Sequence, residues 1–229
     1  MAIYCIGDSH ANFFSGSDEM QPEWPGEGIK HFHPFFRAFR IGPVLAYNLC
    51  RNNSSTRGRE KLMELLSLFP SKSKVMFCFG EIDCRAHIIL QAERQKRPVE
   101  GVVRTVAERY FSVIKEVRGM GFTPLIWNVI PSAPTDINSK INVPAKYLFH
   151  GTREERNDVT RRFNADLKIL AIDHDVFFLD FFDKLMNRDG SVKLEYYCQD
   201  DIHLAQKAMP IVLEALKKSP EFDKEFAPM

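Results

Sequence analysis

The sequence predicts an α/β protein, a three-layer α/β/α sandwich built on a mainly parallel, flavodoxin-like sheet. Short apolar runs rich in β-branched and aromatic residues end at small turn residues, which is typical of buried parallel strands. Longer segments with apolar residues at helical spacing separate these runs, and such alternation favours a sheet covered on both faces. No repeat, low-complexity tract or linker divides the 229 residues, so we expect one domain over residues 1–229.

Four apolar runs are expected to be strands. The first, residues 2–6, stops at Gly7-Asp8-Ser9, where a turn can also present a nucleophile. The carboxyl ends of parallel strands share one edge of a sheet, and ligands bind outside that edge. We therefore expect a site where these runs end. The other three expected strands are residues 74–80, 123–131 and 175–182.

Helical spacing predicts four helices between and after these strands. Thr152 and Glu155 have the spacing of a capping box at the start of the third helix. Pro210 predicts a kink or a late start in the fourth. Residues 132–152 form the longest stretch without a clear period, so we expect an active-site loop there. The predicted helices are residues 58–69, 99–121, 154–173 and 205–218.

Composition restricts the class of partner. The formal net charge is +1, with 31 basic and 30 acidic side chains, so no general field attracts nucleic acid or an anionic membrane. The five cysteines are scattered without a CxxC pair, which favours a reduced compartment. No targeting pattern and no apolar run of membrane-spanning length is evident. We expect a cytoplasmic protein without nucleic-acid or membrane partners, and its oligomeric state stays open.

Asp200 and His203 are three residues apart in a polar stretch before the last predicted helix. At that spacing the carboxylate can reach the imidazole and fix its tautomer, which leaves the other ring nitrogen as a general base. An Asp-x-x-His match alone is most often a pair of polar surface residues. In this chain the match is more specific, because Ser9 follows the first strand and both segments are expected at the sheet edge where the strands end.

Gly7-Asp8-Ser9 and Asp200-Asp201-Ile202-His203-Leu204 resemble the first and last blocks of the SGNH hydrolases, the GDSL-type esterase superfamily. The resemblance extends from residue 2 to about residue 218. It implies that Ser9 is the nucleophile, His203 the general base and Asp200 its orienting carboxylate, without a metal or other cofactor. It also implies an oxyanion hole that contains the backbone N–H groups of Ser9 and Gly42.

The third block departs from the family pattern Gly-x-Asn-Asp, because this chain has Gly80-Glu81-Ile82-Asp83. Ile82 has no polar atom where the family has a side-chain oxyanion donor. Losing such a donor costs about 3–4 kcal/mol, on the order of 100- to 1000-fold in rate. Three explanations are open: Arg85 or Asn128 stands in for the missing donor, the enzyme is slow or adapted to an unusual acyl group, or the site binds a ligand without turnover. We favour replacement by a neighbour.

Several further residues are candidates for substrate binding. Asp8 is expected to hydrogen-bond turn amides, and Glu81 either positions substrate or pairs with Arg85. His10 directly follows Ser9, so its side chain is expected to point away from the Ser9 face. His31 and His33 lack further ligands in a metal-binding pattern, so no metal is expected. The candidate substrate-binding residues are Asp8, Glu81, Arg85, Asn128 and Arg156.

The resulting hypothesis is a serine esterase, acyl hydrolase or acyltransferase. By resemblance, the expected partner is a small-molecule or saccharide ester, with an O-acetyl carbohydrate as the leading class. The rival hypothesis is a non-catalytic carbohydrate-binding protein that lost an oxyanion donor at Ile82. A flavodoxin-like nucleotide binder ranks last, because the chain has no Gly-rich phosphate loop.

Overall fold

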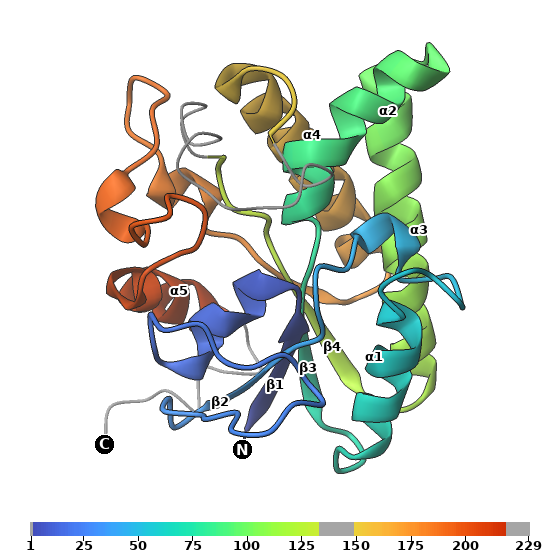
Figure 1. Ribbon diagram of the computed structural model, residues 1–229, viewed down its shortest axis with the longest axis vertical. Coiled ribbons are helices and arrows are strands. Elements are labelled where there is room, and N and C mark those ends of the chain that lie inside the picture. The colour runs from blue at the N-terminus through green and yellow to red at the C-terminus, as the bar shows by residue number, and fades with distance from the viewer. Residues whose placement is uncertain (1, 133–148, 219–229) are drawn as a thin grey trace.

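The computed structural model describes residues 2–132 and 149–218. Within these ranges five parallel strands form one sheet in the order β2-β1-β3-β4-β5, with β1 paired to β2 on one side and to β3 on the other (Figure 1). This topology confirms the predicted α/β class with a parallel sheet. The strands are β1 (Ile3–Gly7), β2 (Phe36–Arg40), β3 (Lys74–Cys78), β4 (Thr123–Trp127) and β5 (Phe177–Leu179).

Helices surround the sheet, as the periodicity predicts. Thr152 and Glu155 form the expected capping box at the start of α4, and Pro210 stands in the first turn of a late-starting α5. None of the helices within the described ranges is long and apolar enough to cross a membrane. The α-helices are α1 (Gly58–Ser67), α2 (Ile88–Gln95), α3 (Val99–Gly119), α4 (Arg153–Asp173) and α5 (Met209–Leu216).

The alternation of β3 shows how two cores form on opposite faces of the sheet. Val75 and Phe77 belong to a core shared with α1, α3 and α4, whereas Met76 and Cys78 belong to a core shared with α5 and the N-terminal 3₁₀-helix η1 (Ser9–Ser15). Successive side chains of a strand point to opposite faces. All four residues are 0% exposed. Both faces of the sheet are therefore covered, and the architecture has three layers.

The sequence-based prediction misses the edge strand β2 and the helix α2. Along β2, Phe36 and Ala38 are buried while Arg37 and Arg40 are partly exposed. The Arg37 guanidinium donates to the carbonyl oxygens of His33 and Phe36. Arg37 and Arg40 interrupt this edge strand, so it lacks the continuous apolar run that predicts the inner strands.

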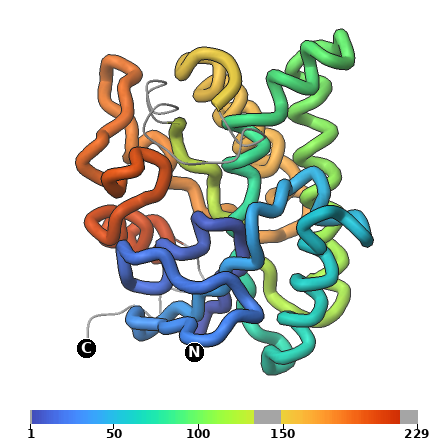
Figure 2. The backbone as a smooth tube through the Cα atoms, in the orientation of Figure 1, coloured from blue at the N-terminus to red at the C-terminus, as the bar shows by residue number. Residues whose placement is uncertain are grey.

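Residues 9–18, which follow β1, meet residues 200–206 beside the carboxyl end of that strand. Figure 2 shows the segment that precedes α5, in orange-red, beside the blue N-terminal segment. Gln206 fixes this approach, because its backbone N–H donates to Asp18 Oδ1 at 2.6 Å and its side-chain amide donates to the Phe13 carbonyl at 2.6 Å. Residues far apart in sequence therefore gather at one edge.

Candidate active site

Ser9, His203 and Asp200 form a continuous hydrogen-bonded chain. Ser9 Oγ lies 2.7 Å from His203 Nε2, and His203 Nδ1 lies 2.5 Å from Asp200 Oδ2. The second oxygen of Asp200 accepts the backbone N–H groups of Ile202 and His203 at 2.9 and 3.0 Å. The structure thus joins the three residues that the sequence predicts as nucleophile, base and orienting acid.

The surroundings of Asp200 favour its charged form. Partial burial alone would raise its pKa, but the hydrogen bonds from His203 and from the backbone outweigh burial and hold the pKa well below its usual range. An ionised carboxylate at Nδ1 fixes the tautomer whose Nε2 can accept a proton. The arrangement can therefore remove the proton from Ser9 Oγ and stabilise the imidazolium that results.

Gly7 and Asp8 explain the tight turn that presents Ser9. A Cβ on Gly7 would lie 2.2 Å from the Cys78 carbonyl oxygen, so only glycine allows β1 and β3 to approach this closely. Asp8 is fully buried, and its Oδ1 accepts the backbone N–H of His10 at 2.9 Å. Burial raises the pKa of Asp8 well above its usual value. This contact is of the turn-amide kind expected, and its substrate-binding role stays a prediction.

Gly42 follows the edge strand β2 and lies close to the end of β1. The N–H of Ile41 donates to the Gly7 carbonyl at 2.9 Å, which ties this segment to the turn before Ser9. Gly42 has φ 102°, in the region that favours glycine. Its position beside β1 fits the predicted donor, and its role in an oxyanion hole stays a prediction.

The third block uses Asp83 to hold the segment after Gly42. The two carboxylate oxygens of Asp83 accept the backbone N–H groups of Ala46 and Tyr47 at 2.7 and 3.1 Å. Burial raises the pKa of Asp83 to about 7, although both N–H groups lower it. Ile82 is buried, 4% exposed. The block therefore links the end of β3 to the segment that carries Gly42.

His10, Glu81 and Arg85 form a buried cluster next to the triad. Arg85 Nε donates to Glu81 Oε1 at 2.7 Å, and Glu81 Oε2 lies 3.2 Å from His10 Nε2. The ring of His10 lies 4.8 Å, centre to centre, from the ring of His203. The expectation that His10 points away from the site is wrong, because the turn after Ser9 folds its side chain inward against His203.

Burial and pairing set the charges in this cluster. Burial lowers the pKa of His10, against the opposing effect of Glu81. Burial alone would raise the pKa of Glu81, but Arg85 and His10 hold it below its usual range. Glu81 is therefore charged and His10 neutral near pH 7. The sequence carried a signal for this cluster, a histidine directly after the nucleophile and a Glu–Arg pair four residues apart.

The side chains of Asn128 and Arg156 contact the backbone and loop ends. The Asn128 amide donates to the Val129 carbonyl at 3.0 Å and accepts the N–H of Phe181 at 2.7 Å, which joins the ends of β4 and β5. Arg156 is 0% exposed and donates to Ser132 Oγ at 2.8 Å and to the Gly151 carbonyl at 2.6 Å. Burial lowers the pKa of Arg156 to about 10. Their roles in substrate binding stay predictions.

The predicted loop at 132–152 is described only at its ends. Ser132 is held by Arg156 and by Asn157, whose side-chain oxygen accepts the Ser132 N–H at 2.7 Å. At the other end the ring of Phe149 lies under both guanidinium groups, 5.0 Å from Arg85 and 4.7 Å from Arg156. The rest of this prediction, residues 133–148, lies outside the described residues.

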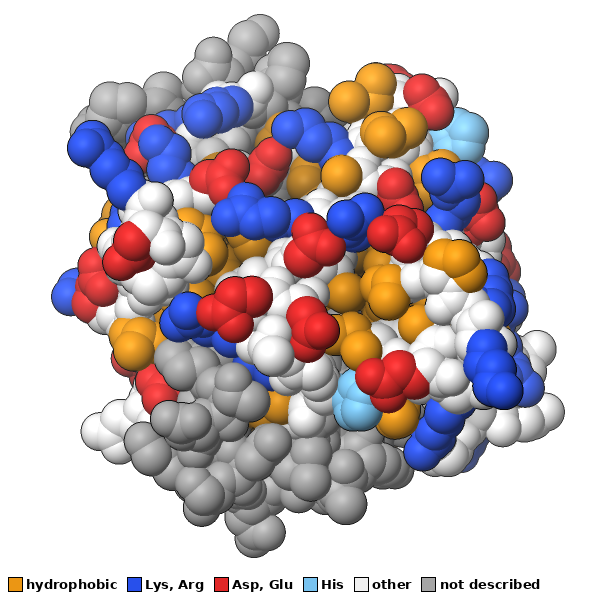
Figure 3. Space-filling model, turned by 90° about the horizontal axis from the view of Figure 1, so that it is seen from above, with side chains coloured by type: hydrophobic (Ala, Val, Ile, Leu, Met, Phe, Trp, Pro, Cys, Tyr) orange, Lys and Arg blue, Asp and Glu red, His pale blue; other side chains and the backbone are white. Residues whose placement is uncertain are grey.

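A small cavity opens beside the triad. It has a volume of about 110 Å³ and is lined by Ser9, His10, Phe13, Cys198 and His203, among others. Seen from above, the end of the molecule toward which the strands run carries acidic and basic side chains intermixed, without one dominant sign (Figure 3). In residues 2–132 and 149–218, no group of three or more His, Cys, Asp or Glu side chains has a metal-binding arrangement.

Comparison with known proteins shows the fold. No family model and no curated protein sequence matches the chain. Among solved structures, the aryl esterase of M. smegmatis aligns with a TM-score of 0.56 and 16% identity, over 99% of both chains. A GDSL-like lipase from Bacteroides thetaiotaomicron gives a TM-score of 0.54 and 13% identity, over 98% of this chain and 89% of the other.

A third similar structure is not named as an esterase or a lipase. The OSK domain of Drosophila Oskar aligns with a TM-score of 0.57 and 12% identity, over 95% of this chain and 87% of that domain. The fold matches that of the GDSL esterases and lipases over nearly the whole chain. At these identities the likeness shows the fold alone, so function has to be argued from the site.

Proposed function

We propose that this protein is a serine esterase or acyl hydrolase of the SGNH type, or an acyltransferase with the same mechanism. The observation that carries the proposal is the unbroken chain from Asp200 through His203 to Ser9, with contacts of 2.5 and 2.7 Å. Ser9 and His203 are 194 positions apart in the sequence. A nucleophile within reach of a base, which a third group orients, is the arrangement that activates a serine.

In the proposed mechanism Ser9 Oγ attacks the acyl carbonyl carbon while His203 Nε2 takes the hydroxyl proton. The C=O π bond opens to an oxyanion, which the backbone N–H groups of Ser9 and Gly42 stabilise. The tetrahedral intermediate collapses, the ester C–O bond breaks, and His203 returns its proton to the leaving alcohol. Water or an acceptor hydroxyl then attacks the acyl-enzyme with His203 as base, and Ser9 is regenerated.

The oxyanion hole is proposed to rest on backbone donors. The two candidates for replacing the missing side-chain donor are each held by contacts with other groups: Arg85 Nε donates to Glu81, and the Asn128 amide bonds two backbone groups. With Ile82 at the position of that donor, the rate is expected to be on the order of 100- to 1000-fold below that of a complete hole. We therefore favour an esterase with slow turnover over one in which a neighbouring side chain replaces the missing oxyanion donor.

The proposed substrate class is an O-acetyl or other short O-acyl ester of a carbohydrate. The class follows from the resemblance of the two end blocks, and the small cavity beside Ser9 supports the short acyl group. Its volume of about 110 Å³ is roughly that of three to four water molecules at about 30 Å³ each. This volume has room for an acetyl group or another short acyl group.

A non-catalytic carbohydrate-binding protein is the second candidate, and Ile82 is the observation that favours it. The geometry at Ser9 counts against it, since binding alone does not require an aligned base and acid. A fluorophosphonate probe separates the two candidates. Covalent labelling at Ser9 supports the enzyme, and saccharide binding without labelling supports the second candidate.

Hydrolysis of p-nitrophenyl acetate by the Ser9→Ala variant tests the proposal directly. We expect loss of turnover and of fluorophosphonate labelling, with unchanged unfolding in urea. Ser112→Ala, at an exposed position on α3, is the matched control and should keep both. Full activity of Ser9→Ala would refute the proposed function.

A further inference from the structure

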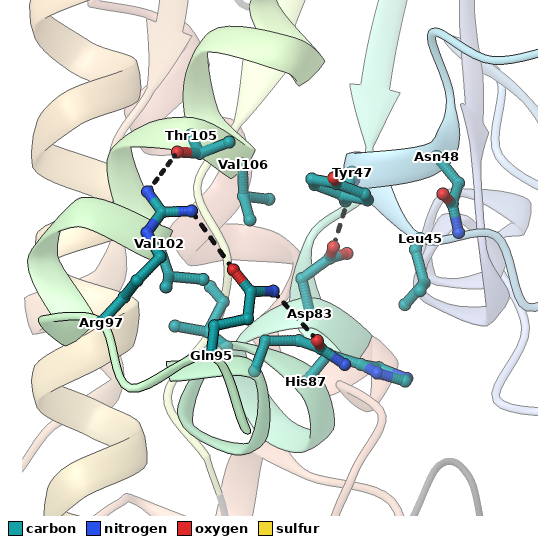
Figure 4. A pocket seen from close by; sticks show the side chains of 12 residues that line it. Leu45, Tyr47, Asn48, Asp83, His87, Gln95, Arg97, Val102, Thr105 and Val106 are labelled. Atoms are coloured by element: carbon teal, nitrogen blue, oxygen red, sulfur yellow. Dashed lines mark hydrogen bonds between the residues drawn. The ribbon is translucent and has the colours of Figure 1, made fainter. Parts of the chain in front are cut away.

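A second and larger cavity lies at the same end of the molecule as the triad. Its volume is about 310 Å³, at the low end of the range of about 300–1,000 Å³ in which small-ligand sites occur. It opens between the segment after β2, the short π-helical turn η3 (Asp83–His87) and helices α2 and α3 (Figure 4). None of its lining residues belongs to the proposed triad.

The cavity has an apolar wall and a polar rim. Leu45, Ile88, Val102 and Val106 supply apolar surface. The rim residues Gln91, Gln95, Arg97 and Thr105 are linked by hydrogen bonds of 3.2–3.3 Å (Figure 4).

These rim hydrogen bonds are long and lie at an exposed surface, so each contributes little. A ligand can replace them with contacts of its own at little cost. Amide and hydroxyl groups both donate and accept, so the rim suits a ligand that carries hydroxyl groups.

The charges around the cavity favour a neutral ligand. Asp83 already accepts the N–H groups of Ala46 and Tyr47. Arg97 donates to Gln95, Thr105 and the Gly101 carbonyl. Both ionisable groups are therefore already hydrogen-bonded within the protein. Together with the apolar wall and the hydroxyl-binding rim, this matches a sugar ring, which has C–H faces and neutral hydroxyl groups.

Short connections join this cavity to the proposed catalytic centre. Leu45 is three residues after Gly42, and three residues span at most about 11 Å at about 3.6 Å each. Asp83 directly follows Ile82 and holds the same segment through Ala46 and Tyr47. The cavity therefore borders the same segment that carries the proposed oxyanion donor Gly42.

We propose that this cavity is a subsite for a neutral glycosyl unit of the ester substrate, remote from the ester that is cleaved. The inference rests on the proposed function and narrows it, because the substrate becomes an acylated glycan of at least two sugar units. Binding energy from the remote unit then favours such a glycan over a simple acetyl ester.

Val106→Phe tests the subsite by filling the cavity, and Ser112→Phe adds the same side chain on the exposed side of α3 as its control. With xylobiose acetylated on only one of its two xylose units as substrate, we expect Val106→Phe to lower kcat/KM about tenfold, mainly through KM, which corresponds to about 1.4 kcal/mol. With p-nitrophenyl acetate both variants should match the wild type. Retained p-nitrophenyl acetate hydrolysis also shows that the variant is folded.

The double rim variant Gln91→Ala/Gln95→Ala gives an independent measurement, since Gln91 is half-buried and Gln95 is exposed. It should weaken hydrolysis of acetylated xylobiose selectively, as Val106→Phe does. Unchanged kinetics on acetylated xylobiose in both variants, or equal losses on both substrates in the folded rim variant, would overturn the subsite.

If the proposed catalytic function is wrong, the measurements differ from those expected when only the subsite is wrong. If the wild-type protein cleaves neither ester and the fluorophosphonate probe leaves Ser9 unlabelled, the catalytic proposal is wrong. The cavity is then judged by titration with unmodified xylobiose, followed by NMR. Binding that Val106→Phe abolishes and Ser112→Phe preserves supports a glycosyl site, and absence of binding to the wild type overturns it.

Discussion

Glu81→Gln tests the buried cluster beside His203 with almost no change in shape. Glu81 and Arg85 are 9% and 7% exposed at their side chains and 2.7 Å apart. Removing one partner of a buried pair typically costs about 3–5 kcal/mol, because the remaining charge stays buried without its counter-charge. For a chain of 229 residues each kcal/mol lowers Tm by roughly 2–4 °C, so we expect a decrease of roughly 6–20 °C.

Urea unfolding at pH 7 measures this loss against a matched surface pair. Glu116 is 42% exposed and pairs with Arg59, so Glu116→Gln should change the free energy of unfolding by less than about 1 kcal/mol. The double variant Glu81→Gln/Arg85→Met should recover much of the stability, because replacing both partners of a buried pair removes the uncompensated charge.

The pH dependence of the free energy of unfolding tests whether Glu81 stabilises the protein in its charged form. The pKa of Glu81 is lowered on folding, so its contribution to stability is present above the ordinary glutamate pKa of about 4.3 and is lost as the pH falls below it. The stability difference between the wild type and Glu81→Gln should therefore shrink below about pH 4. Equal effects of Glu81→Gln and Glu116→Gln at pH 7 would contradict the argument for a buried, charge-paired Glu81.

Three further variants test the turn, the third block and the triad. Asp200→Asn should keep the fold but lower kcat for p-nitrophenyl acetate by on the order of 10⁴-fold, since an amide at Nδ1 favours the wrong tautomer of His203; activity near that of the wild type would remove Asp200 from the mechanism. Gly42→Ala should destabilise the protein by about 1–3 kcal/mol in urea, because alanine is strained at φ 102°; an unchanged unfolding midpoint would contradict this. The pKa of Asp83 is raised to about 7, so the folded protein loses stability as the pH rises from about 4 to 7; Asp83→Asn should lack this loss, and parallel stability–pH curves would refute it.

Periodicity sufficed for the inner elements of the fold because their physical signals are local. Parallel strands buried on both faces appear as apolar runs, and α3 and α4 repeat their apolar residues at helical spacing. The edge strand β2 shares its second face with solvent, and Arg37 and Arg40 interrupt its apolar residues. Helix α2 has only eight residues, too few for its period to stand out beside the preceding apolar strand.

The triad was predicted from the resemblance of two short blocks, whereas the role of the third block was not. Its carboxylate, Asp83, finds its partners at Ala46 and Tyr47, and such pairing over more than thirty positions leaves no local pattern. The inward side chain of His10 likewise meets Glu81, which lies in the helical segment after β3. Local sequence indicates which residue types are present, but the partners that fix their charge come from the tertiary fold.

The separation of Ser9 from His203 by 194 positions has a consequence during synthesis of the chain. The nucleophile emerges 194 residues before its base, so a nascent or half-folded chain carries the serine without the group that activates it. Closing such a long loop is also slow compared with forming local helices. Appearance of esterase activity during refolding would accordingly mark the final docking of the segment before α5, after the sheet itself has formed.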